Sequence, residues 1–84
     1  MITSPVLKKT FGHELQELRK AKGLSQEKLG YQVGLERAYI SRMERGISQP
    51  TLTVLVELGK ALGVSASEIL ARVEKRFQSS PAPK

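Results

Sequence analysis

Two arginines, Arg37 and Arg42, carry side chains suited to recognition chemistry and lie in a segment predicted to be helical. Apolar Ile40 and Met43 recur in this segment at helical spacing, which predicts a helix over about 36–45 with the arginines on its other faces. A guanidinium can donate two hydrogen bonds to the O6 and N7 atoms of guanine. The same side chains could also form a solvated helix face, so residue type alone leaves both interpretations open.

Catalytic and metal chemistry have little support in the sequence. The chain contains one histidine, His13, and no cysteine. Cysteine-based zinc sites are therefore excluded, and a single histidine with scattered carboxylates makes no recognisable metal site. Neither a Gly-x-Ser-x-Gly motif nor a phosphate-binding glycine-rich motif occurs. We expect His13 on a helix surface, no enzymatic activity, and no metal, cofactor or small-molecule ligand.

Size and charge narrow the class of protein further. The 84 residues allow one domain with one modest core. Fourteen Lys and Arg residues against eight Asp and Glu give a net charge of +6, which suits a polyanionic partner, although it could serve solubility alone. No apolar run approaches the roughly 20 residues that span a bilayer. No secretory signal is evident either, so we expect a cytoplasmic protein.

Helical periodicity runs along the chain, and no segment is predicted to be a strand. Five helices are predicted, over about residues 7–21, 25–33, 36–45, 52–62 and 65–77. Hydroxyl side chains that can cap a helix N-terminus begin three of these segments, at Ser25, Thr51 and Ser65. Glycines that can adopt left-handed backbone end four of them, at Gly23, Gly34, Gly46 and Gly63. The sequence therefore predicts a compact, all-α, five-helix fold.

One folded unit is predicted, over residues 7–77. Residues 1–6 are expected to be flexible, with Pro5 either before the first helix or in its first turn. The tail at 78–84 has no apolar periodicity and is expected to be disordered. One apolar stripe of the fourth helix is expected to face the core; it consists of Leu52, Leu55, Leu58 and Leu62.

The second and third helices are short, and only Gly34 and Leu35 separate them. A turn this tight forces a large crossing angle, as in a helix-turn-helix. Gly30 lies inside the second helix, where the missing side chain permits another helix to approach closely. Because glycine costs roughly 1 kcal/mol against alanine in a helix, packing should compensate at this position.

A long, ordered set of residues carries a family pattern: Leu18-Arg19, Gly23-Leu24-Ser25-Gln26-Glu27-Lys28-Leu29, Gly34, Tyr39-Ile40-Ser41, Glu44-Arg45-Gly46, Pro50, Leu55 and Ala61-Leu62-Gly63-Val64. Over about residues 11–70 the chain resembles the XRE family of lambda-repressor-like DNA-binding domains. That family includes phage repressors, restriction–modification controller proteins and many bacterial regulators. Two positions depart from its pattern: Glu36 replaces a frequent Ser or Asp cap, and Gly30 replaces a frequent Ala.

The resemblance and the geometry of the motif together imply how the third helix is used. In a helix-turn-helix, the N-terminal part of the second motif helix meets base edges in the major groove. Arg37, Ala38 and Arg42 match family positions that face the bases, and Tyr39 and Ser41 lie beside them. An alanine here can pack on a thymine methyl group.

Phosphate contacts and one ion pair are also expected. Gln26 begins the second helix, where its amide and the free N–H groups can hold a phosphate. Arg45, Ser48 and Gln49 should lie near the DNA backbone, although the last two could be an ordinary polar loop. The resemblance further implies an ion pair between Arg19 and Glu44 that orients the recognition helix while adding little net stability.

A two-fold homodimer is predicted because one recognition helix covers only a few base pairs. Apolar residues that exceed the needs of the core are candidates for an isologous interface: Val54, Val56, Val73 and Phe77. We expect Ile69 and Leu70, by contrast, to lie mainly in the core. Alternatively, the apolar residues of the fifth helix simply close the core over the first and fourth helices; they are Ile69, Leu70, Val73 and Phe77.

These observations predict a small regulator that binds double-stranded DNA as a homodimer on a pseudo-palindromic operator. The alternative from another class is a protein-interaction module, such as an antitoxin or a coactivator-like bridge. The outer face of the third helix discriminates between them. Two arginines on that face favour DNA, whereas an apolar face would favour a protein partner.

Overall fold

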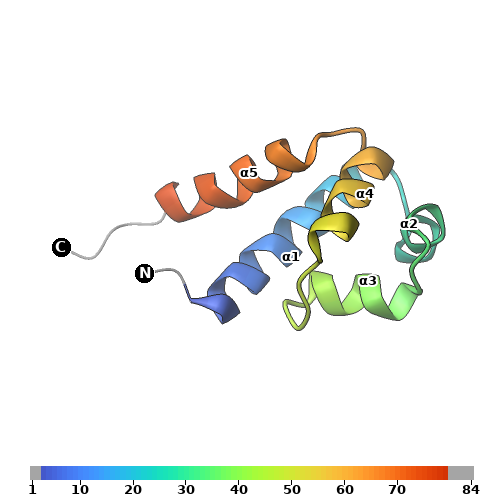
Figure 1. Cartoon of the computed structure of the whole chain (residues 1–84), viewed down its shortest axis with the longest axis horizontal. Coiled ribbons are helices and arrows are strands. Elements are labelled where there is room, and N and C mark those ends of the chain that lie inside the picture. The colour runs from blue at the N-terminus through green and yellow to red at the C-terminus, as the bar shows by residue number, and fades with distance from the viewer. Residues whose placement is uncertain (1–2, 80–84) are drawn as a thin grey trace.

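Five α-helices account for the architecture of residues 3–79, the part of the chain that this computed structural model describes; side chains are described for residues 3–76. The helices are α1 (Ser4–Ala21), α2 (Gln26–Val33), α3 (Arg37–Glu44), α4 (Leu52–Leu62) and α5 (Ala66–Ser79), and no strand occurs among the described residues (Figure 1). The predicted all-α, five-helix fold is confirmed. No helix within this range is long and apolar enough to cross a membrane.

The first helix begins earlier than the sequence predicted. The hydroxyl of Thr3 accepts a hydrogen bond from the backbone N–H of Val6, and Pro5 occupies the first turn. A proline is tolerated there because its missing N–H has no partner inside the helix. Residues 4–6, expected to be flexible, are therefore helical. Residues 78–79 of the expected tail are also helical, while 80–84, like 1–2, lie outside the described residues.

Local capping chemistry explains where three later helices begin. The hydroxyls of Ser25, Thr51 and Ser65 accept hydrogen bonds of 3.0, 3.1 and 3.0 Å from backbone N–H groups three residues further on. Each bond satisfies a donor that the first helical turn leaves without an intrahelical partner. These three predicted caps are confirmed. Glu36 at the start of α3 makes no such bond with its side chain.

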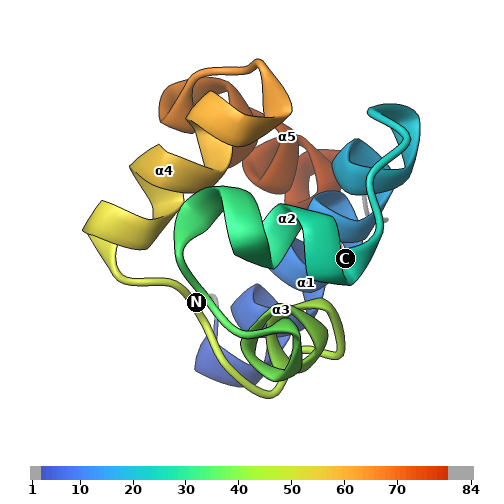
Figure 2. The same cartoon turned by 90° about the vertical axis from the view of Figure 1, so that its right-hand side faces the viewer.

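The core lies where α1 packs against both α3 and α5, with α2 and α4 closing it from the other side (Figures 1 and 2). It is aliphatic apart from the ring of Phe11 and the thioether of Met43. Its buried members are Phe11, Leu15, Leu29, Ile40, Met43, Leu55, Leu58, Leu62, Ile69 and Val73.

Two core expectations are wrong. Leu52 is 81% exposed, because it is the first residue of α4 and its side chain leans toward the free N-terminal end of the helix. In α5, Val73 is 1% exposed and Leu70 is 44% exposed, the reverse of what we expected. Ile69 and Val73 are four residues apart and share the core face, whereas Leu70 is rotated by about 100° from Ile69.

Glycines inside the helices allow backbone to approach backbone closely, at Gly12, Gly30 and Gly59. A methyl group on Gly12 in α1 would overlap the carbonyl oxygen of Met43 and lie 2.7 Å from that of Glu44, at the end of α3. A methyl group on Gly30 would lie 2.5 Å from the carbonyl oxygen of Leu35. Gly30 is therefore closely approached, but mainly by the turn after α2 and not, as expected, by the body of another helix.

Candidate nucleic-acid interface

Helices α2 and α3 form a helix-turn-helix at one end of the molecule. Gly34 ends α2 in left-handed backbone, with φ of 73°, and the N–H of Leu35 donates a 2.8 Å hydrogen bond to the carbonyl of Gly30. In Figure 2, α2 runs across the view while α3 is seen nearly end-on, so the two helices cross at a large angle. The turn that the sequence predicted is confirmed.

One face of α3 is buried and the other is exposed. Ile40 and Met43 are completely buried, which fixes the rotation of the helix about its own axis. Arg37, Ala38 and Arg42 are exposed, and two further predicted base-contact residues, Tyr39 and Ser41, are half-buried. The structure thus brings the predicted base-contact residues together on one accessible side of α3.

A charged pair ties α3 to α1. The Arg19 Nε donates to Glu44 Oε2 at 2.5 Å, and its Nη2 donates to Glu44 Oε1 at 3.0 Å. The Arg19 Nη1 also donates to the carbonyl of Leu24 at 2.8 Å. The two side chains are only 10% and 2% exposed. The pair that the resemblance implied is therefore formed, in a bidentate geometry that resists rotation.

Gln26 extends this pair toward the surface. Its Nε2 donates to Glu44 Oε1 at 3.0 Å, and its Oε1 accepts from Arg37 Nη1 at 3.4 Å. A continuous chain of hydrogen bonds therefore runs from buried Arg19 to exposed Arg37. Sequence reasoning missed this internal role of Gln26, because local pattern does not indicate contacts between separate helices. Its phosphate contact stays a prediction.

The other predicted phosphate-contact residues follow the end of α3. Arg45 is exposed, and its Nε donates to the hydroxyl of Ser41 at 3.2 Å. Ser48 and Gln49 lie in the loop before α4, where the N–H of Ser48 donates to the carbonyl of Arg42 at 3.3 Å. These residues lie close to α3, as residues that contact the DNA backbone beside it must. Their phosphate contacts remain predictions.

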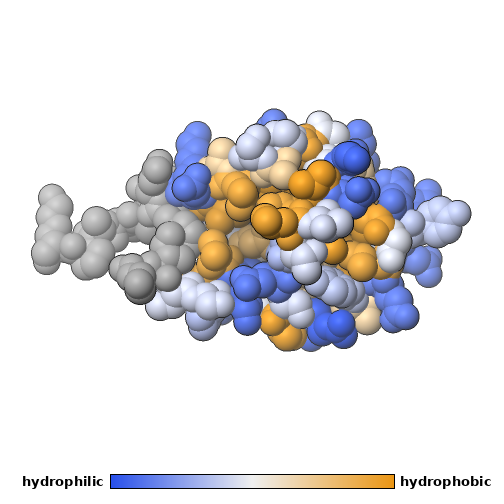
Figure 3. Space-filling view, viewed as in Figure 1, coloured by the Kyte–Doolittle hydropathy of each residue, from blue (hydrophilic) through white to orange (hydrophobic). Residues whose placement is uncertain are grey.

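Exposed cations dominate this end of the molecule. Figure 3 shows mostly hydrophilic side chains where α2 and α3 lie. The exposed charged residues of the motif include four cations, Lys28, Arg37, Arg42 and Arg45. They also include two carboxylates, Glu27 and Glu36, since Glu44 is taken up by its ion pair. A surface of this sign attracts a polyanion.

A family model described as a helix-turn-helix domain matches residues 10–71. The chain belongs to the helix-turn-helix family. The match covers all of the two motif helices, most of α1, all of α4 and the beginning of α5.

Relatives of this helix-turn-helix protein are named as regulators. The HTH-type transcriptional regulator y4dJ of Sinorhizobium fredii is 38% identical over 69 residues, 82% of this chain and 90% of that one. Control protein C.MunI of a Mycoplasma species is 39% identical over 70 residues, 82% of this chain and 95% of that one. The crystal structure of the restriction-modification controller protein C.AhdI from Aeromonas hydrophila is 42% identical, with a TM-score of 0.71 over 74% of this chain and 94% of that one. The predicted family is confirmed, and it is one of transcriptional regulators rather than enzymes.

The predicted dimer residues of this helix-turn-helix protein have different surroundings. Val56 is exposed, and Val54 is half-buried against the core. Val73 is a core residue with only 1% of its surface exposed, so the prediction that it is an interface residue is wrong. The side chain of Phe77 lies outside the described residues.

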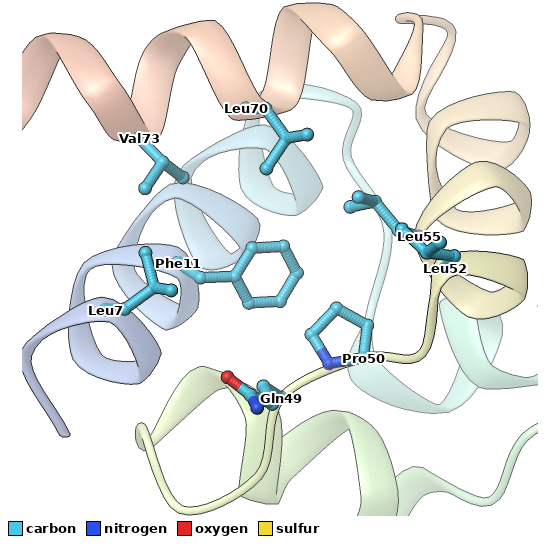
Figure 4. Close-up of a pocket in the computed structure, with 8 residues that line it drawn as sticks. All are labelled: Leu7, Phe11, Gln49, Pro50, Leu52, Leu55, Leu70 and Val73. Atoms are coloured by element: carbon cyan, nitrogen blue, oxygen red, sulfur yellow. The ribbon is translucent and has the colours of Figure 1, made fainter. Parts of the chain in front are cut away.

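A groove that the sequence did not predict lies between α1, α4 and α5. It has a volume of about 270 Å³, and Figure 4 shows side chains from all three helices and the loop before α4 directed into it. We call it the apolar groove; it is lined by Leu7, Phe11, Gln49, Pro50, Leu52, Leu55, Leu70 and Val73. Adjacent apolar residues in α5, Ile69 and Leu70, were the signal that one helix had more apolar surface than its core face needed.

Proposed function

We propose that this protein regulates transcription by binding a specific sequence of double-stranded DNA, with α3 in the major groove. One observation carries the proposal. The exposed side of α3 presents Arg37, Ala38 and Arg42, while the ion pair of Glu44 holds the helix rigidly against α1. A rigid helix with arginines on its free face suits direct reading of base edges. The proposal includes a cytoplasmic location.

Two classes of contact belong to the proposal. Arg37, Ala38 and Arg42 read bases, with Tyr39 and Ser41 beside them. Residues around this face hold the phosphates and set the register; they are Gln26, Arg45, Ser48 and Gln49. The hydrogen bond between Gln26 and Arg37 supports a link between the two sets, because a phosphate bound to the amide of Gln26 would also restrain Arg37.

Selection of bound sites from a random pool of DNA duplexes tests the proposal. Arg37→Ala should lower operator affinity by about 1–3 kcal/mol and flatten the preference at one base position. Arg42→Ala should do the same at another position. Lys60→Ala is a matched control, because it removes an exposed cation from α4, outside the motif. Unchanged affinity and preference after removal of both arginines would contradict the proposal.

We propose further that the protein binds a pseudo-palindromic operator as a homodimer. Two copies reading half-sites about one helical turn apart would supply specificity that one short helix lacks. Exposed apolar side chains on α4 and α5 support pairing through these two helices; they are Leu52 and Leu70, which line the apolar groove, and Val56. Sedimentation equilibrium of the free protein and of its DNA complex is the test. A monomer in both states, well above the dissociation constant for DNA, would contradict the dimer.

A protein-interaction module, acting as an antitoxin or as a coactivator-like bridge, is the competing function. The charged exposed face of α3 favours DNA over this alternative. Retention on a DNA column that falls steeply with salt would support the proposal, since phosphate contacts release counterions. Retention insensitive to salt would favour a protein partner.

A further inference from the structure

We propose that Tyr39 positions Arg42 for base reading instead of contacting a base itself. This inference rests on the proposed function, in which Arg42 reads the operator. The central observation is that the guanidinium carbon of Arg42 lies 5.7 Å from the centre of the Tyr39 ring. That separation is within the range of about 6 Å over which a cation is attracted to the face of an aromatic ring.

The ring of Tyr39 is itself fixed, so it can act as a platform. It is half-buried and packs against the hydrophobic core beneath α3. Residues three apart on a helix are neighbours, so Tyr39 meets Arg42 without any distortion of the backbone. A long arginine side chain that rests on a fixed ring samples fewer conformations before it meets DNA.

The same two residues hold the loop that follows α3. The carbonyl of Arg42 accepts hydrogen bonds from the N–H groups of Ile47 and Ser48, at 2.9 and 3.3 Å. The hydroxyl of Tyr39 donates a long, 3.5 Å hydrogen bond to the carbonyl of Gln49. Tyr39 therefore lies between a proposed base reader and the proposed phosphate contacts. Its ring should matter more than its hydroxyl, because a bond of that length is weak.

Arg37 provides the contrast within the same helix. Its guanidinium is oriented by the side-chain oxygen of Gln26, 3.4 Å away, and has no aromatic ring beneath it among the described contacts. A change at Tyr39 should therefore alter the base position read by Arg42 and leave that of Arg37 unaffected. This selectivity separates a positioning role from general damage to the fold.

The test compares Tyr39→Leu, which keeps apolar bulk but removes the ring face, with Tyr39→Phe, which removes only the hydroxyl. Tyr39→Leu should weaken operator binding about three- to tenfold, the cost of ordering one long side chain on binding. It should weaken the base preference at the same operator position as Arg42→Ala does. In the Arg42→Ala background it should cause no further loss of affinity. Tyr39→Phe should bind within about twofold of the parent, since the ring face is retained.

Two outcomes would overturn the inference. One is additive loss in the double variant. The other is a loss of base preference in Tyr39→Leu at an operator position where Arg42→Ala keeps its preference. Tyr39 would then read a base of its own. If Arg42→Ala alone changes no base preference, the proposed function of Arg42 has failed instead.

A measurement on the free protein guards against simple misfolding of the variants. Nitrogen-15 relaxation of the Arg42 Nε–H group reports the motion of that side chain on the ps–ns timescale. Arg42 should be restrained in the parent and in Tyr39→Phe, and mobile in Tyr39→Leu, while Arg37 is unchanged in all three. Equal mobility of Arg42 in the parent and in Tyr39→Leu would overturn the positioning role, whatever happens to DNA binding.

Discussion

The guanidinium of Arg19 lies 2.5 Å from the carboxylate of Glu44, which joins the last turn of α1 to the last residue of α3. Both charges are almost removed from water. Each charge is stable in the buried site only because the other is present, since a lone buried charge loses its hydration and gains nothing in return. The geometry of the DNA-facing helix is therefore coupled to the stability of the core.

Glu44→Ala should destabilise the protein by about 3–5 kcal/mol, because it leaves Arg19 buried with only the carbonyl of Leu24 as partner. Replacing both members, as Arg19→Met with Glu44→Leu, should recover much of that loss. Urea unfolding followed by circular dichroism measures both values. Glu57→Ala is the control, because its pair with Lys60 is exposed and should contribute less than about 1 kcal/mol. Equal small losses at Glu44 and Glu57 would contradict the assigned role.

Gly12→Ala should destabilise the protein by about 1–3 kcal/mol, although alanine is normally the better helix former. The added methyl group would meet the carbonyl oxygens of Met43 and Glu44, so α1 and α3 would have to separate. Gly23→Ala is the matched control, since nothing lies within 4 Å of its added methyl group and only the positive φ of 75° is strained. Thermal unfolding of both variants checks the expectation. A stabilised Gly12→Ala variant would refute the close contact.

Leu52→Ser should weaken self-association while changing the free energy of unfolding by less than about 0.5 kcal/mol, because the side chain is mostly solvated in the monomer. Tyr31→Ser is a matched control from α2, where the tyrosine is 87% exposed and lies outside the apolar groove. Sedimentation equilibrium of both variants measures the effect. If the two variants associate alike, Leu52 is no part of the interface.

Glu14 is buried and its two arginine partners are not, so removing the arginines should cost more stability than removing Glu14. Its side chain is 4% exposed and accepts hydrogen bonds from Arg72, at 2.9 Å, and from Arg76, both of which are far more exposed. Removing both arginines, as Arg72→Met with Arg76→Met, leaves an uncompensated buried charge. Glu14→Met leaves two arginines that can be hydrated. Chemical unfolding should show the larger loss for the arginine pair, and the opposite order would contradict this account.

Features set by neighbouring residues could be predicted from the sequence. The caps at Ser25, Thr51 and Ser65 each depend on one hydroxyl and one N–H three residues away. The turn at Gly34 depends on backbone freedom at a single position. The exposure of the arginines of α3 could also be predicted. Ile40 and Met43 recur at helical spacing, so one face of the helix is buried and the arginines lie on the others.

Features set by contacts between helices could not be predicted in this way. In α5, Ile69 and Leu70 are both apolar neighbours, so periodicity does not decide which one is buried. Packing on α1 and the hydrogen bond from Arg72 to Glu14 accompany an orientation of α5 that buries Ile69 and Val73. The bonds of Gln26 likewise join residues on different helices, which no local pattern encodes.

The carboxylate pairings of Arg19, Arg72 and Arg76 also affect how the protein would respond to ionic strength. Counterions condensed on DNA are released when a protein cation binds a phosphate in their place. Each such contact makes the slope of log affinity against log salt concentration more negative by about 0.9. These three arginines already have fixed anions beside them. The slope of log affinity against log salt should therefore reflect only cations without a fixed anion, such as Arg45, whose neighbour Ser41 is uncharged. The number of cations that this slope implies should be well below the total of fourteen Lys and Arg residues.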